Sequence, residues 1–167
     1  MKSIIIFLTL FLFISCSTKK TDKELFDDAK KNLTEKNIPE AVLSFDKLIE
    51  EYPESNLTPE ALSELAAIYQ NRQVKSLSDT ENLEKSVQLF KKLHDDYPNS
   101  EYGPSGLFMA GFICANELNN YEKAKAIYQQ FLIEYPDNEL AASAKAELDN
   151  MGLSPEEILQ KNMAKEQ

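Results

Sequence analysis

The chain is poor in several residue types, and each shortage excludes or disfavours a class of fold or site. It has no tryptophan, four glycines, two cysteines and one histidine in 167 residues. The two cysteines, Cys16 and Cys114, are too few for a disulfide framework or a zinc site. With little glycine and abundant alanine, leucine, glutamate and lysine, the composition favours helices over sheets. A chain of this length fits one domain with a buried core.

Basic residues are scarce relative to acidic ones. The chain has 18 lysines and arginines against 28 aspartates and glutamates, which gives a net charge of −10 at pH 7. A basic stripe for phosphate groups is therefore missing, and nucleic-acid binding is not expected. The same charge repels an anionic membrane surface, so any attachment to a membrane must come from something other than electrostatics.

The N-terminal segment has the pattern of a secretion signal. Lys2 gives a positive start, and residues 4–14 form an apolar run broken only by Thr9. This run is too short for a permanent membrane-spanning helix. The sequence Phe13-Ile14-Ser15-Cys16 resembles the lipobox of bacterial lipoproteins, whose cysteine is lipidated and becomes the mature N-terminus. The resemblance implies lipidation at Cys16, and Ser17 resembles a signal for the outer membrane. The alternative is an ordinary signal peptide in which Cys16 is incidental.

A repeated motif divides the rest of the chain. Tyr-Pro followed by helix-capping residues occurs at 51–55, 96–100 and 134–138, and proline ends a helix. Before each proline stands a small residue, an aromatic residue four positions later and an apolar residue three positions after that. These positions share one helical face. The three sets are Ala41, Phe45 and Leu48; Ser86, Phe90 and Leu93; and Ala124, Tyr128 and Phe131.

The same spacings predict the helix boundaries. We expect helices near 22–35, 38–51, 59–72, 80–96, 104–117, 121–134, 139–151 and 155–164. Pairs with capping-box spacing support the starts: Thr21 with Glu24, Asn37 with Glu40, Ser78 with Glu81, and Ser154 with Glu157. Two links depart from the repeat. The one from Tyr69 to Ser86 is long enough for an extended helix or a protruding loop at 74–79, and 117–120 is about one residue too long.

The motif resembles the second helix of the tetratricopeptide repeat, and residues such as Leu62, Leu65, Ala66 and Tyr69 fit the first helix. The resemblance implies an all-α, right-handed α-solenoid of about three repeats plus a C-terminal capping helix. The corresponding division is a lipoprotein signal peptide (1–15), a lipidated cysteine and short tether (16–21), a repeat domain (22–153) and a short C-terminal helix or tail (154–167).

The Tyr-Pro endings and the Tyr-Glu-Lys-Ala sequence at 121–124 are closest in style to two groups of cell-envelope proteins. These are the BamD (YfiO)-like lipoproteins of outer-membrane barrel assembly and the C-terminal repeat domain of CpoB (YbgF)-like coordinators of the Tol–Pal system. The lipobox favours the first group, and the number of repeats disfavours it. The resemblance implies a lipid-anchored scaffold, monomeric within a larger complex, that faces the periplasm at the outer membrane and binds envelope proteins or peptides.

Tetratricopeptide repeats bind partners on a concave face lined by their first helices. Phe26, Phe108 and Phe112 would offer apolar contacts to a partner there, and Lys23 and Lys30 would meet acidic groups. The alternative is that the phenylalanines pack against neighbouring helices. Carried over by position, the partner-binding residues are Lys23, Phe26, Lys30, Ser63, Ala67, Gln70, Phe108 and Phe112.

No constellation of residues indicates catalysis, and we expect neither an enzyme nor a cofactor nor a metal site. His94 lacks a nearby nucleophile or second ligand and is predicted to lie on the surface of a helix. Cys114 is predicted to be a small buried residue in place of an aromatic one. The alternative function is an accessory lipoprotein that binds a small ligand, which would require a deep, closed pocket.

Overall fold

The computed structural model describes residues 19–165, and within this range every regular element is helical. The predicted signal peptide and Cys16 lie outside the described residues. The helices are α1 (Asp22–Thr34), α2 (Ile38–Glu51), α3 (Thr58–Gln70), α4 (Asp79–Asp96), α5 (Gly103–Phe112), the π-helix η1 (Ile113–Glu117), α6 (Tyr121–Glu134), α7 (Ala141–Asn150) and α8 (Pro155–Lys165). None of them is long and apolar enough to cross a membrane.

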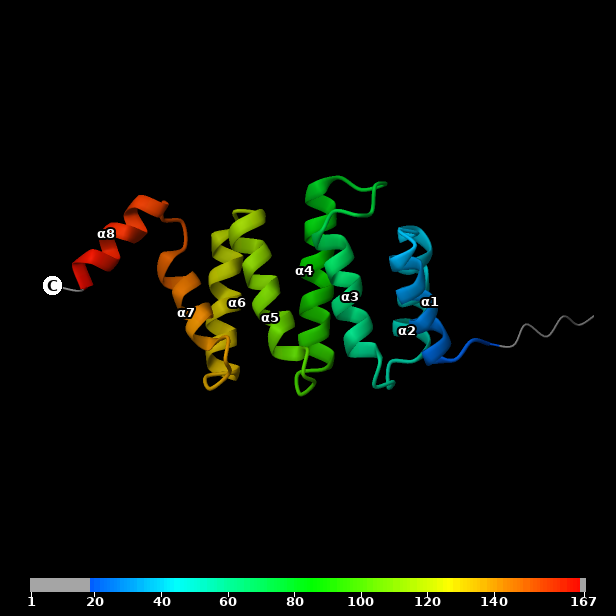
Figure 1. Ribbon diagram of the computed structural model, residues 1–167. Helices are drawn as coiled ribbons and strands as arrows, with labels where there is room; N and C mark the ends of the chain where they lie inside the picture. The colour runs from blue at the N-terminus through cyan, green and yellow to red at the C-terminus, as the bar shows by residue number, and fades with distance from the viewer. Residues whose placement is uncertain (1–18, 166–167) are drawn as a thin grey trace, which may run out of the picture.

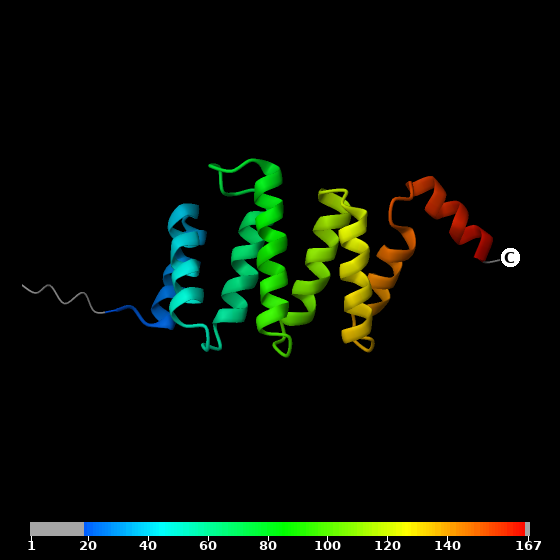
Figure 2. The ribbon, with the colours of Figure 1, turned by 180° about the vertical axis from the view of Figure 1, so that it is seen from behind.

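The helices form a row of antiparallel hairpins, α1–α2, α3–α4 and α5–α6, followed by α7 (Figure 1). Each helix packs mainly against its neighbours in the sequence. Seen from behind, the second helices of the hairpins lie in front of the first ones, so the stack has two layers (Figure 2). The predicted all-α solenoid is therefore confirmed.

The repeated small–aromatic–apolar face forms the core of the stack. In α2 and α6 all of its residues are fully buried, from Ala41 and Phe45 to Tyr128 and Phe131. Ser86, the small residue of α4, is also fully buried, and its hydroxyl donates to the carbonyl of Ala66 at 2.8 Å. This hydrogen bond satisfies a polar group that would otherwise be costly to bury. The repeat therefore fixes which side of each second helix faces its neighbours.

The tyrosines of the Tyr-Pro motifs join successive hairpins in a tyrosine ladder. The hydroxyl of Tyr97 donates to the carbonyl of Pro53 at 2.7 Å, and that of Tyr135 donates to the carbonyl of Pro98 at 3.1 Å. Burial, together with an adjacent carboxylate, raises the pKa of both tyrosines, so the hydroxyls keep their donor protons. Each Tyr-Pro motif thus ends one helix, and the second and third motifs also bind the motif before them.

The two long links are accommodated differently. The first is partly absorbed by α4, which has 18 residues against 14 in α2, and the remainder forms a protruding loop above the stack (Figure 1). The side-chain amide of Asn82 fixes this loop by donating to the carbonyls of Val74 and Ser78, both at 3.0 Å. The extra residue near 117–120 is absorbed by the π-helix η1, whose backbone hydrogen bonds span one residue more than those of an α-helix.

Three of the predicted capping boxes form, and the fourth is wrong. Thr21, Ser78 and Ser154 each accept from the backbone N–H three residues later. Asn37 makes no such bond, although its backbone conformation (φ −91°, ψ 69°) is close to that of Asn120 (φ −91°, ψ 74°), which does cap its helix. The amide of Asn37 donates instead to the side-chain carbonyl of Asn32 at 3.3 Å. Asn120, which was not predicted as a cap, accepts from the N–H of Lys123 at 3.2 Å.

The last helix leaves the stack. Gly152, at a φ of +76°, turns the chain after α7, and α8 projects from the end of the molecule (Figure 1). Lys161 ties α8 back to α7 by donating to the carbonyl of Asp149 at 2.6 Å and to the side chain of Asn150 at 3.2 Å. Leu159 and Met163 remain 62% and 57% exposed. The final helix of the chain therefore leaves apolar surface uncovered.

Candidate functional site

The predicted partner-binding residues come from the first helices of the three hairpins, α1, α3 and α5. We call the side of the stack that these helices form the first-helix face. Lys23 is exposed, and the other seven residues are half-buried: Phe26, Lys30, Ser63, Ala67, Gln70, Phe108 and Phe112. The face thus presents side chains that are partly fixed by their neighbours and partly open to solvent.

Side-chain bridges run from one first helix to the next along this face. Lys30 of α1 forms an ion pair and hydrogen bond with Glu64 of α3. At the end of α3, Gln70 donates to Glu117 of η1 at 3.3 Å, and Arg72 pairs with the same carboxylate at 2.7 Å. Lys30 and Gln70 are therefore engaged within the chain, and their main role in this structure is to hold neighbouring hairpins together.

The three phenylalanines of the face differ in their surroundings. The ring of Phe26 packs edge-on against that of Phe45, with centroids 6.0 Å apart. Phe108 packs against Tyr128 at 5.7 Å and against Phe131 at 6.0 Å. These two rings thus contribute to the core as well as to the face. Phe112 stacks on no other aromatic ring within residues 19–165, which leaves it the most available of the three for a partner.

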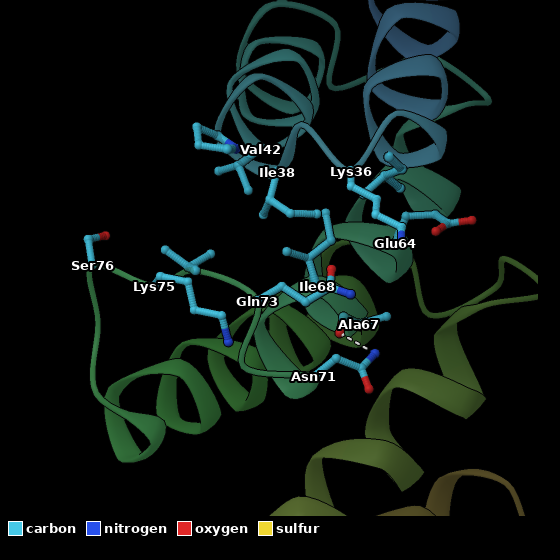
Figure 3. A pocket seen from close by; sticks show the side chains of 13 residues that line it. Lys36, Ile38, Val42, Glu64, Ala67, Ile68, Asn71, Gln73, Lys75 and Ser76 are labelled. Carbon is cyan, nitrogen blue, oxygen red and sulfur yellow. Dashed lines mark hydrogen bonds between the residues drawn. The ribbon is translucent and has the colours of Figure 1, made fainter.

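An apolar groove lies beside this face, between the first hairpin and the protruding loop. This loop groove encloses about 1070 Å³ and is open to solvent (Figure 3). Its walls come from the turn between α1 and α2, the end of α3 and the loop residues 73–76. Ala67 is the predicted partner-binding residue that lines it. The apolar lining residues include Leu33, Ile38, Pro39, Val42, Ile68 and Val74.

Sequence reasoning missed this groove as a site. The sequence feature that pointed to it was the long link after Tyr69. The added residues, 73–76, form a wall of the groove that α3 by itself would not provide. The loop extends toward the first hairpin (Figure 2). The spacing of the sequence does not specify this direction. The groove is wide and open, which fits a segment of protein better than a small enclosed ligand.

The prediction that His94 lies on the surface is wrong, because its side chain is only 5% exposed. It is buried between α4 and α6, where its Nδ1 lies 3.1 Å from the hydroxyl of Tyr135 and its Nε2 lies 3.2 Å from both the amide nitrogen of Gln130 and the carboxylate of Glu134. His94 occupies the same repeat position in α4 that Ile49 occupies in α2 of the first hairpin. His94 therefore occupies a position that is apolar in the other hairpins, and its two ring nitrogens lie next to polar groups at the end of α6.

Cys114 and the acidic side chains at the ends of α2 and α4 are held within the fold. Cys114 is fully buried, as predicted, and burial raises the pKa of its thiol, which disfavours the reactive thiolate. Glu51 is within 4 Å of the amines of Lys19 and Lys47, and Asp96 pairs with Lys92, so these carboxylates serve in ion pairs. Within residues 19–165 no three histidine, cysteine or acidic side chains gather in a way that would hold a metal ion.

Comparison with known proteins agrees with this architecture. Residues 106–138, which cover most of the third hairpin, match the family model described as tetratricopeptide repeat. The fold is similar to that of a tetratricopeptide repeat protein from Parabacteroides merdae, with a TM-score of 0.53 and 22% sequence identity. The similarity covers 72% of this chain and 42% of that one, so the chain spans less than half of that protein. No curated protein matches the chain. The stack is thus one of tetratricopeptide-type hairpins.

Proposed function

We propose that the chain is a lipid-anchored scaffold that binds other proteins of the bacterial envelope through its first-helix face and catalyses no reaction. In this proposal the lipid on Cys16 holds the stack at the periplasmic side of the outer membrane. There the stack takes part in an assembly of the kind that inserts outer-membrane proteins. Tetratricopeptide stacks serve in general as protein-binding surfaces, which supports the protein-binding part of this function.

The observation that carries the proposal is that the side chains of the first-helix face are held in place by contacts between the hairpins. Half-buried side chains from three consecutive hairpins lie along it, and the bridges at Lys30 and Gln70 hold the hairpins in fixed relation. A surface ordered before binding loses little conformational entropy when a partner docks. Phe112, half-buried and without an aromatic neighbour in the described range, supplies the kind of anchor on which interfaces depend.

Site-specific crosslinking tests the proposal. A photo-crosslinking phenylalanine analogue at position 112 is expected to capture envelope proteins in intact cells, since the analogue keeps the aromatic ring in place. Mass spectrometry of the adducts identifies the partners. The matched control carries the same analogue at Tyr121, an aromatic residue of α6 that is 43% exposed. We expect adducts at position 112 that are absent at position 121.

A second substitution links those adducts to the face. Ser63→Arg places a large charged side chain on α3 of the same face, and it should reduce the position-112 adducts by about tenfold, as loss of about 1.4 kcal/mol of binding free energy would. Adducts with barrel-assembly subunits would support the proposed assembly role, and adducts with Tol–Pal proteins would assign the chain to the coordinator group instead. Equal adducts at positions 112 and 121, or none, would contradict the scaffold proposal.

The lipid anchor makes a separate prediction. Cys16→Ser removes the thiol that would carry the lipid, so the mature protein should lose its stable membrane attachment. After cell fractionation, the unchanged chain should sediment with the outer membrane, and the variant should not be found there. Cys114→Ser serves as the control, because Cys114 is buried in the stack and has no part in attachment. If the Cys16 variant stayed in the outer-membrane fraction, the lipid anchor would be ruled out.

A further inference from the structure

Helix α8 carries an apolar stripe with an acidic end. Glu156, Leu159 and Met163 follow one another at helical spacing, so their side chains lie on one face of α8. All three are exposed, and the hydrogen bonds of Lys161 to the end of α7 fix the helix in a projecting position. We call Glu156, Leu159 and Met163 the α8 stripe. Two large apolar side chains on so short a helix are costly to leave in water.

The loop groove, toward the other end of the molecule, is apolar and flanked by basic residues, and so complements the apolar and acidic α8 stripe. Its apolar lining includes Ile38, Val42 and Ile68, and two lysines, Lys36 and Lys75, stand among the side chains around it (Figure 3). Both lysines are exposed, and within residues 19–165 neither forms an ion pair with a carboxylate. In a chain of net charge −10, an apolar groove flanked by two unpaired cations favours an apolar segment that also carries acidic groups.

The α8 stripe of the same molecule cannot fill this groove. α8 projects from the α7 end of the stack, and the groove lies between the first hairpin and the α3 end of the second, so the third hairpin and α7 separate them (Figure 1). We propose that α8 of one copy docks into the loop groove of a second copy. Leu159 and Met163 then enter the apolar lining, and Glu156 lies against Lys36 and Lys75.

The dimensions agree with this arrangement. Eleven helical residues measure about 16 Å along the axis, at about 1.5 Å per residue. A groove of about 1070 Å³ has room for two apolar side chains and part of the helix that carries them. The surface that one such helix buries is well below the roughly 800 Å² per partner of a stable complex, so the contact is weak. Because it joins unlike ends, it extends head to tail instead of closing a dimer.

Cysteine crosslinking of the full chain in its membrane tests this contact. Ser76→Cys places a thiol beside the groove, and Gln160→Cys places one next to the α8 stripe without removing any of its members. With both substitutions in one chain, a bismaleimide crosslinker should give a ladder of dimers, trimers and longer chains on a denaturing gel. Chains with only one of the added cysteines, or with only the natural ones, are the controls and should give no ladder.

Charge reversal then tests the orientation. Lys36→Glu with Lys75→Glu, added to the two cysteines, should reduce the ladder by about fivefold, since like charges then face Glu156. Adding Glu156→Lys should restore at least about half of it, because the reversed charges attract again. These lysines and Glu156 are exposed, so the variants keep the stack intact. No ladder above the controls, or a ladder that the lysine reversal leaves unchanged, would overturn the proposal. Neither result bears on the adducts expected at position 112.

Discussion

Phe45→Ala is expected to lower the free energy of unfolding by about 3–5 kcal/mol, the range for truncating a fully buried phenylalanine. The ring is 0% exposed at the centre of α2 and packs edge-on against Phe26 of α1. Its removal leaves a cavity between the two helices of the first hairpin. Because α1 has no hairpin on its outer side within the described residues, the structure there has little other packing to compensate.

Urea denaturation followed by circular dichroism measures this loss, with a chain that begins at Lys19. Leu43→Ala is the matched control, because Leu43 lies in the same helix and is 67% exposed. The control should change the free energy of unfolding by no more than about 0.5 kcal/mol. A loss at Phe45 as small as that at Leu43 would mean that the first hairpin does not pack as described.

Gly106→Val is expected to destabilise the stack by about 3 kcal/mol, at the upper end of the usual cost of overpacking. A Cβ at Gly106 of α5 would lie 2.9 Å from the carbonyl oxygen of Phe90 and 3.1 Å from a methyl group of Leu93, both in α4. The carbonyl belongs to a helical backbone and cannot move aside, so α4 and α5 must separate. Helix propensity alone predicts the opposite sign, since glycine is about 1 kcal/mol worse than alanine within a helix.

A graded series separates the two effects. Gly106→Ala should destabilise less than Gly106→Val, and Ala126→Val at an exposed position of α6 should cost only about 0.5 kcal/mol of helix propensity. Thermal unfolding of the three variants beside the unchanged chain gives the comparison. If Gly106→Ala raised the stability, the close approach of α4 and α5 would be contradicted and helix propensity would be the dominant effect.

The helices and the core could be predicted from the sequence because local signals specify both. Each Tyr-Pro motif ends a helix through the geometry of proline, and the spacing of residues such as Phe45 and Tyr128 defines one buried face. Asn37 shows where local signals fail. Its spacing to Glu40 fits a capping box, but its side-chain amide donates to Asn32 of α1 instead, a contact that the local pattern does not specify.

His94 was misjudged for a different reason. Residue type alone suggested a solvated position, yet His94 lies four residues after Phe90, as Ile49 does after Phe45 and Leu132 after Tyr128. The repeat itself therefore indicated a side chain that packs against the core, as Ile49 and Leu132 do. What no repeat could indicate is the set of polar groups on α6 that makes the burial of an imidazole tolerable.

The candidate sites were less predictable than the fold, because they depend on contacts between separate hairpins. The sequence placed Lys30 and Gln70 on the first-helix face, but only the structure shows that both are engaged by Glu64 and Glu117. The loop groove depends on where the residues after Tyr69 fold, and an insertion in a repeat carries no information on its direction.

The tyrosine ladder makes the stack modular. Tyr97 and Tyr135 each recognise a backbone carbonyl of the preceding Tyr-Pro motif, and a backbone carbonyl is the same whichever repeat supplies it. A whole hairpin gained or lost between two such motifs would therefore leave each remaining junction with a matching donor and acceptor. Duplication or deletion of entire repeats can thus change the length of such a protein while every junction between hairpins keeps the same hydrogen bond. An insertion or deletion of a few residues within a motif would instead disturb the junction that this motif forms.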